Sequence, residues 1–247
     1  MHWGLLLLWI IGVTSVTLLG SLYARRYGRS DLLIGLYVAF ILAAQMLATK
    51  IALFTVGPWH FTAPAGVLVF SVTFLLLDIV NERFGRKAAQ GMITIAFVAQ
   101  VAMAFFIWLG TQFHAAPEWA QQGETWDALF SLVPQITVAS WVAFFISENI
   151  DAYIYAWFRR VTAGRHLWLR NAVSTLPALV IDSALFVPLA FFGVLPFTVM
   201  LAVIKGQIVL KWIVGLINVP FMYMNYAILR HKGDIPEHEL WQGDVPE

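Results

Sequence analysis

The sequence predicts an all-α membrane protein whose helices cross the bilayer several times. Hydrophobic residues make up 60% of its 247 residues and charged residues only 12%, whereas about a quarter of a soluble protein is charged. Seven apolar stretches are each long enough to cross a bilayer as a helix of about 20 residues. Basic residues also gather on alternate connections between these stretches. This composition excludes an ordinary cytoplasmic enzyme and leaves no room for a separate soluble domain.

The predicted spans form one transmembrane domain over residues 1–230. They cover residues 4–23, 32–54, 64–81, 88–110, 132–157, 171–193 and 197–229. The first stretch lacks the basic start of a signal peptide, so we expect it to remain as an anchoring helix. Residues 231–247 contain two prolines and several acids, which predicts a solvated, disordered cytoplasmic tail.

The loop charges predict the orientation, because short loops rich in Lys and Arg stay in the cytoplasm. Twelve of the fifteen basic residues follow the first, third, fifth and seventh spans, whereas residues 55–63, 111–131 and 194–196 contain no Lys or Arg. We therefore expect an outside N-terminus and a cytoplasmic C-terminus in the cell inner membrane. The 111–131 connection holds Trp119 and Trp126, which suits an interfacial aromatic belt or a short re-entrant lid.

Charged residues inside the spans are the main functional signal. One such residue near the centre of a span costs on the order of 3 kcal/mol on insertion scales. Asp182, Lys205 and Lys211 are the deepest, whereas Lys50 is close enough to a helix end to reach the interface. The remaining acidic residues in or at the ends of spans are Asp78, Glu148 and Asp151.

Helical spacing places polar residues on one face of each of four helices. The faces contain Ser71, Asp78 and Glu82; Ser140, Ser147, Glu148, Asp151 and Tyr155; Asn171, Ser174 and Asp182; and Gln207, Lys211 and Asn218. Four converging faces favour a polar cavity, the default interpretation of intramembrane ionisable groups. The alternative is that Asp182 or Glu148 pairs with Lys205 or Lys211 as a buried salt bridge that fixes helix register. Three tryptophans beside these faces are candidates for stacking on a ligand: Trp141, Trp168 and Trp212.

Several kinds of chemistry lack the residues that they need. The chain has no cysteine, and all six histidines lie in termini or loops, so no imidazole or thiolate is available within the bilayer. The sequence also has no Gly-x-x-x-x-Gly-Lys-Ser/Thr phosphate loop. We therefore expect a protein that is not an enzyme, holds no metal or cofactor and does not hydrolyse ATP itself. The net charge of +1 gives no bulk attraction to nucleic acid.

One segment carries a specific resemblance. Residues 64–90, PAGVLVFSVTFLLLDIVNERFGRKAAQ, form an apolar helix that ends in Asp-x-x-Asn-Glu and continues with Phe-Gly-Arg-Lys. This segment resembles the signature of the queuosine precursor transporter family, also called the vitamin-uptake-like transporter family. Residues 138–160, 168–186 and 204–223 are similar to the same family, so the resemblance covers the chain from about 30 to 225.

The resemblance implies import of queuosine precursors, which are 7-deazaguanine bases used in tRNA modification. It also implies a six-helix core similar to the substrate-binding subunits of energy-coupling-factor vitamin transporters, with the first helix as an addition. The positions that match the family are Asp78, Asn81, Glu82, Ser140, Asp151, Asn171, Ser174, Asp182, Gln207 and Lys211. Glu148 stands where a neutral Gln is expected, which leaves open whether the ligand or the coupling differs.

The implied substrate suggests roles for these residues. A guanine-like edge offers two adjacent donors that one carboxylate accepts, so Asp182, Glu148 or Asp151 would bind the base edge. Asn171 or Gln207 would complete the polar contacts beside Ser174, and Trp168 or Trp212 would stack on the ring. Lys211 would balance the carboxylates without ligand, and Asp78, Asn81 and Glu82 would serve coupling or gating.

Other functions stay open at this point. The protein could transport or bind another small heterocycle or vitamin, since a fold does not fix its ligand, or it could be a non-transporting structural membrane protein. Transport could be facilitated, proton-coupled or driven by an ATPase module as partner, and the chain could form a homo-oligomer.

Overall fold

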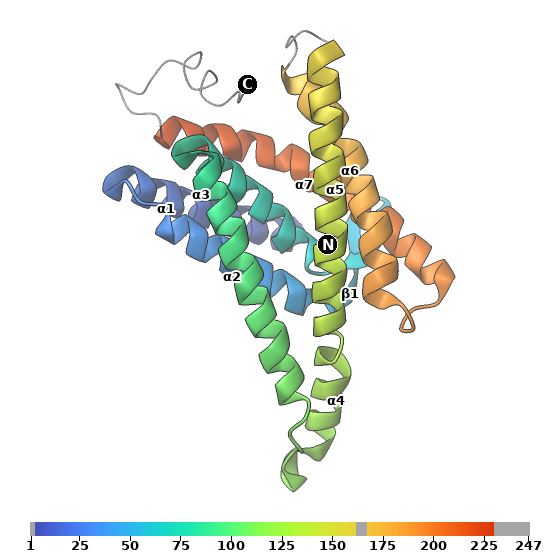
Figure 1. Cartoon of the computed structure of the whole chain (residues 1–247). Helices are drawn as coiled ribbons and strands as arrows, with labels where there is room; N and C mark the ends of the chain where they lie inside the picture. Colours follow the sequence, from blue (N-terminus) through green and yellow to red (C-terminus); the bar gives the residue numbers. More distant parts are fainter. Residues whose placement is uncertain (1–2, 162–166, 230–247) are drawn as a thin grey trace.

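The computed structural model describes residues 3–161 and 167–229, and almost all of them are helical (Figure 1). The elements in chain order are α1 (Trp3–Tyr27), α2 (Asp31–Ala48), β1 (Ile51–Val56), β2 (Trp59–Pro64), α3 (Val67–Gly110), the short 3₁₀ helix η1 (Pro117–Trp119), α4 (Ala120–Phe130), α5 (Val133–Val161), α6 (Leu167–Phe191) and α7 (Phe197–Leu229). The tail predicted at 231–247 lies outside the described residues.

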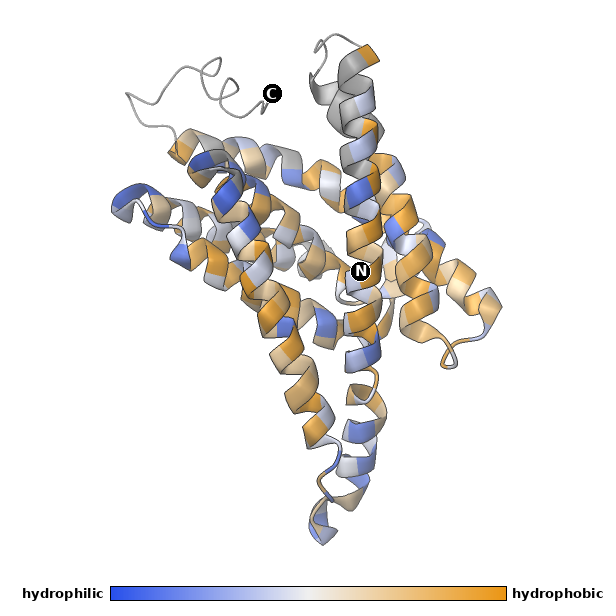
Figure 2. Cartoon of the chain, in the orientation of Figure 1, coloured by the Kyte–Doolittle hydropathy of each residue, from blue (hydrophilic) through white to orange (hydrophobic). Residues whose placement is uncertain are grey.

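The described helices have the length and composition of membrane spans. Five segments are long and apolar enough to cross a bilayer: Leu7–Tyr27, Asp31–Ala48, Lys87–Gly110, Pro117–Ser147 and Phe197–Leu229. Two shorter apolar segments cover Val67–Asn81 and Leu176–Phe191. Apolar residues also cover the outer faces of the helices (Figure 2), where side chains such as Phe145 and Leu216 are more than 70% exposed. A lipid bilayer would cover these faces, and the prediction of an all-α polytopic membrane protein is confirmed.

The third and fourth predicted spans are the two halves of α3, which meet at Gly85. This residue has φ +80° and ψ 171°, a conformation inside the helix that is not helical. Glycine adopts it without the clash that a Cβ would cause. The two halves therefore run in different directions from this point, as the upper left of Figure 1 shows.

A β-hairpin between α2 and α3 corrects the predicted helix boundaries. The second span was expected to reach residue 54, but α2 ends at Ala48 and residues 51–56 form β1. β1 pairs antiparallel with β2, with Ile51 opposite Pro64 and Val56 opposite Trp59. The β-branched and aromatic residues of the sequence IALFTV favour this strand. Pro64, expected at the start of the third span, is the last residue of β2.

Two glycines allow the hairpin, and the short connection from the hairpin to α3, to lie directly against helix backbones. A Cβ added at Gly206 of α7 would lie 2.1 Å from the carbonyl oxygen of Thr62 in β2. A Cβ added at Gly66, just before α3, would lie 2.2 Å from the carbonyl oxygen of Ala44 in α2. Both distances are far below van der Waals contact. The hairpin is thereby held deep against α7 and α2.

The buried apolar side chains of the described residues form three clusters. One cluster joins α1, α2, α3 and the end of α7, with Leu33, Leu76 and Met92 fully buried. A second joins α5, α6 and α7 around Ile136 and Phe191. A third joins the hairpin to α3 and α7 through Phe54, Ala63, Val67 and Leu210. The hydroxyl of Ser21 in α1 donates a 2.7 Å hydrogen bond to Asn225 Oδ1 of α7, so the N-terminal helix is tied to the remainder of the bundle.

The 111–131 connection contains η1 and α4, and none of the residues of these two helices is buried. It projects from the lower end of the bundle in Figure 1. Trp119 and Trp126 are 61% and 39% exposed, and Trp126 packs on Phe130 with ring centroids 4.7 Å apart. Such exposed tryptophans suit a membrane interface.

Candidate functional site

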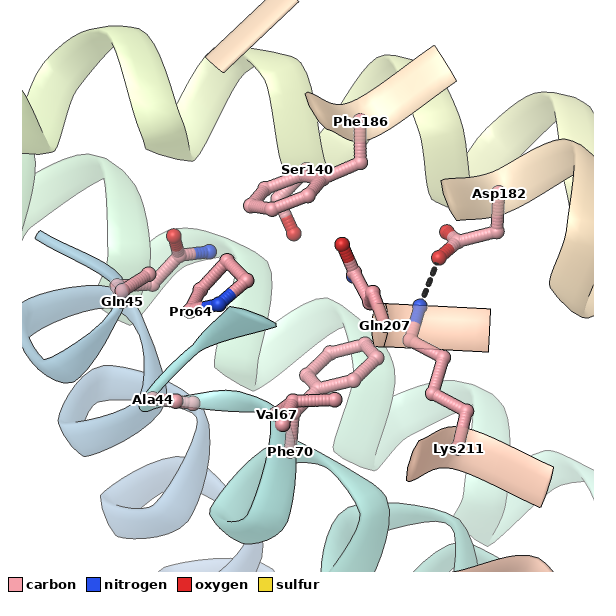
Figure 3. A pocket seen from close by; sticks show the side chains of 12 residues that line it. Ala44, Gln45, Pro64, Val67, Phe70, Ser140, Asp182, Phe186, Gln207 and Lys211 are labelled. Atoms are coloured by element: carbon pink, nitrogen blue, oxygen red, sulfur yellow. Dashed lines mark hydrogen bonds and ion pairs between the residues drawn. The ribbon is translucent and has the colours of Figure 1, made fainter. Parts of the chain in front are cut away.

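An internal cavity lies where the hairpin meets four helices and the beginning of α3. We call it the hairpin cavity. Its lining residues come from six elements and the Gly66 connection (Figure 3): Ala44, Gln45, Ala48, Pro64, Gly66, Val67, Phe70, Ser140, Asp182, Phe186, Gln207 and Lys211. Helical periodicity explains the arrangement, because Gln207 and Lys211 are one turn apart on α7, as are Asp182 and Phe186 on α6. The cavity therefore collects polar groups within otherwise apolar helices.

A buried ion pair forms one wall of the hairpin cavity. Lys211 Nζ donates to Asp182 Oδ2 (dashed line in Figure 3), and the two side chains are only 2% and 12% exposed. The Lys211 ammonium also lies 5.5 Å from the centroid of the Phe70 ring, within cation–π range. This pair is one of the buried salt bridges that the sequence predicts. Both partners also line the cavity. For this pair, the two alternatives from the sequence, a buried salt bridge and a polar cavity, are therefore compatible. The other candidate partner, Lys205, is exposed.

Gln207 offers an unpaired acceptor to the same cavity. Its side chain is only 5% exposed, and its Oε1 atom has no hydrogen-bond partner in the part of the chain that the structure describes. Figure 3 shows the amide pointing into the space between Asp182 and Ser140. A buried acceptor without a partner costs about 1–3 kcal/mol. A ligand N–H placed here would recover that cost.

Aromatic rings and a second amide complete the walls. Phe70 and Phe186 line the cavity from α3 and α6, whereas Trp212, predicted to stack on a ligand, is 39% exposed and is not among the described lining residues. Gln45 Nε2 donates a 2.8 Å hydrogen bond to Gln100 Oε1. Gln45, Phe70 and Phe186 are thus site residues that the sequence analysis did not select. Gln45 does carry a signal, because it is the polar residue within the apolar stretch of α2.

The cavity is narrow without a ligand. The centre of a water molecule can occupy about 40 Å³ of it, and a buried water needs roughly 10–15 Å³ of such space. The cavity therefore accommodates a few water molecules. A bicyclic ligand must push lining side chains apart.

Several predicted site residues lie elsewhere or outside the described side chains. Asp78 and Asn81 are exposed on α3 near the Gly85 turn and are not among the described lining residues. Of the matched polar positions, Ser140, Asp182, Gln207 and Lys211 do meet at the cavity. Among the predicted site residues, six have side chains that the structure does not describe: Glu82, Glu148, Asp151, Trp168, Asn171 and Ser174.

Two members of the predicted polar faces link helices instead of lining the cavity. Ser71 is buried, and its hydroxyl donates to Val67 O. The backbone oxygen of Ser71 accepts a 2.9 Å hydrogen bond from Asn218 Nδ2 of α7. The bond from Asn218 connects α3 to α7, whereas Asn218 Oδ1 is buried and has no hydrogen-bond partner among the described residues.

The fold and the cavity define a class of protein: a multi-pass helical membrane protein with a cavity that collects buried polar groups. Residues 64–225 match the family described as "Putative vitamin uptake transporter", and the chain belongs to this family of membrane transporters. The family resemblance inferred from the sequence is thus confirmed. The chain is also 26% identical, over 87% of its own length and 92% of the relative's, to the "Probable queuosine precursor transporter" of Bacillus subtilis (strain 168). No solved structure matches the chain.

Proposed function

We propose that this transporter imports queuosine precursors, 7-deazaguanine bases, through the hairpin cavity. The observation that carries the proposal is the unpaired Gln207 Oε1 beside the buried Asp182–Lys211 pair. The printed name of the Bacillus subtilis relative supports the choice of substrate.

The polar groups of the cavity complement the edge of such a base. A guanine-type edge has adjacent N–H and NH₂ donors next to a carbonyl acceptor. The Asp182 carboxylate accepts at about four lone-pair sites, so it can bind the two donors while keeping Lys211. The Lys211 ammonium has three donors, and one can reach the carbonyl oxygen of the base. Gln207 Oε1 then accepts from a further ring N–H, and the Phe70 and Phe186 rings contact the faces of the base.

The place of the cavity supports uptake from outside. The hairpin that borders the cavity belongs to a connection that has no Lys or Arg at 55–63. On α6, the last lining residue is Phe186, and the helix ends five residues later at Phe191, just before the connection 194–196, which also has no Lys or Arg. By the charge rule these connections face outside. We propose that the protein lies in the inner membrane with its N-terminus outside and its C-terminus in the cytoplasm. Asp78, Asn81 and Glu82, near the opposite ends of the spans, keep their proposed role in coupling or gating.

Ligand-dependent thermal stabilisation of the purified protein tests the proposal. A ligand that binds only the folded state raises its stability, by about 2.7 kcal/mol at a concentration of 100 Kd. We expect stabilisation by 7-deazaguanine bases and uptake of the labelled base by cells that lack their own salvage transporter. Gln207→Leu should weaken both effects.

The family description favours a second candidate, a transporter of another small heterocycle or vitamin. Stabilisation by a vitamin but not by deazaguanines would select it. If a panel of deazaguanines, guanine and vitamins gave no shift, a structural role would replace both proposals.

A further inference from the structure

A second cavity adjoins the hairpin cavity and is not explained by the site described above. We call it the Trp141 cavity. Its walls come from α2, both halves of α3 and α5, and the centre of a water molecule can occupy about 60 Å³ of it. Most of the walls are apolar, and the polar side chains among them include Thr73, Gln100, Ser140 and Trp141.

The two cavities are neighbours along the direction of transport. Phe70 and Ser140 line both. Along α2 the lining moves from Ala44 and Ala48 to Tyr37 and Ile41, which at 1.5 Å per residue is a shift of about 10 Å. Along α5 and the first half of α3 the lining shifts in the same sense. In each element the shift is towards the connections that carry the Arg and Lys clusters.

Side chains that can move separate the two cavities. The Phe70 ring lies between them, and the Gln45–Gln100 hydrogen bond joins a residue of the hairpin cavity to one of the Trp141 cavity. The Phe70 ring is also the one that lies under the Lys211 ammonium. A ligand that engages Lys211 would therefore act next to a ring that lines both cavities.

Trp141 carries the signal for a ligand. Its Nε1 atom is buried and has no hydrogen-bond partner among the described residues. The indole N–H is a donor only, and buried tryptophans usually find an acceptor. The ring is held in place by Phe97, with centroids 4.5 Å apart and an interplanar angle of 42°. A buried donor held in place, on a residue that lines a cavity, is what a binding site for a hydrogen-bond acceptor requires.

We propose that the Trp141 cavity is a second binding site on the transport path, where Trp141 Nε1 donates a hydrogen bond to an acceptor atom of the substrate. This inference rests on the proposed function of the hairpin cavity. The hairpin cavity leaves an acceptor unpaired at Gln207 Oε1, whereas the Trp141 cavity leaves a donor unpaired. One substrate that satisfies both must carry an N–H donor and a carbonyl or ring-nitrogen acceptor on a planar heterocycle. Transport then passes the substrate from the first site to the second when the Phe70 ring turns aside.

Trp141→Phe tests the inference, because it keeps an aromatic ring and removes only the N–H and part of the indole. The loss of an unpaired donor costs no hydrogen bond, whereas the smaller ring removes some packing, so the melting temperature without ligand should fall only slightly. Uptake of the labelled 7-deazaguanine base should fall about threefold to tenfold, while its affinity for the purified protein changes less than twofold. The matched control is Trp108→Phe, at an exposed position of α3, which should change neither quantity.

A second measurement identifies the contact itself. An analogue of the base without the carbonyl acceptor loses the proposed contacts with both Lys211 and Trp141, so the wild-type protein should take it up more slowly. Trp141→Phe should add no further loss with this analogue, because the hydrogen bond from Trp141 is already absent. Wild-type uptake by Trp141→Phe would overturn the second site. If the wild-type protein neither binds nor takes up the base, the proposed function itself fails, and the second site fails with it.

Discussion

Removing one partner of the Asp182–Lys211 pair should destabilise the protein far more than removing both. Lys211 and Asp182 are 2% and 12% exposed, so Asp182→Leu leaves an ammonium in a site with little access to water. Breaking a buried pair in this way costs about 3–5 kcal/mol, whereas replacing both partners with apolar residues of similar volume is often neutral. For a chain of this size, 1 kcal/mol corresponds to roughly 2–4 °C in melting temperature. The single variant should therefore melt on the order of 10 °C below the wild type.

The assay is thermal unfolding of the purified single variants and of the double variant Asp182→Leu with Lys211→Met. We expect the double variant to melt within about 4 °C of the wild type, since a change of 1 kcal/mol in stability shifts the melting temperature by about 4 °C at most. The base should no longer stabilise this variant, because both replaced groups line the hairpin cavity. This separates the structural role of the pair from its role in binding. If each single variant melted like the double variant, the charges would not be buried together as described. A double variant that still bound the base would remove the pair from the site.

Two glycine positions give further predictions. Gly206→Ala places a Cβ 2.1 Å from the Thr62 carbonyl oxygen, so the hairpin must move, and we expect a lower melting temperature and reduced uptake. Gly215→Ala on the same helix meets nothing within 4 Å and should be neutral or slightly stabilising; equal effects at both positions would contradict the close contact. Gly85→Ala forces a residue with a Cβ to φ +80°, which costs about 1–3 kcal/mol. The control is Gly91→Ala, at a helical position where an added Cβ meets nothing within 4 Å, and this change should raise the melting temperature. A Gly85→Ala protein as stable as the wild type would show that the turn in α3 does not need glycine.

The convergence of Asp182, Gln207 and Lys211 could be predicted from the sequence for two reasons. A charge inside a membrane helix is costly, so each charged residue is expected to have a partner or a function. Helical periodicity also places residues one turn apart on the same face. The partner of each charge could not be predicted. Lys205 and Lys211 are both on α7, but they lie on different faces, and only the packing of α6 on α7 decides that Lys211 meets Asp182.

The hairpin could not be predicted from local sequence. Its first strand, IALFTV, is separated from the apolar stretch of α2 by only Thr49 and Lys50. A short apolar run does not distinguish a strand from a buried helix by its periodicity. What stabilises the strand pair is contact with α7, where Gly206 leaves room for Thr62, and these two residues are far apart in the chain. The hydrogen bond between Gln45 and Gln100 could not be predicted for the same reason. The two residues are 55 positions apart in the chain, and no local pattern links them.

On the proposed transport path, the distribution of paired and unpaired groups would let a substrate bind and still be released. A transport site must bind well enough for entry and weakly enough for exit. Asp182 already has Lys211 as its partner, so a ligand exchanges or shares contacts there and gains little net free energy from the charge. Gln207 Oε1 and Trp141 Nε1 lack partners among the described residues, so a ligand that satisfies them gains the full hydrogen bond. The neutral groups should therefore decide which heterocycle is carried, while the ion pair keeps the affinity moderate and holds α6 against α7.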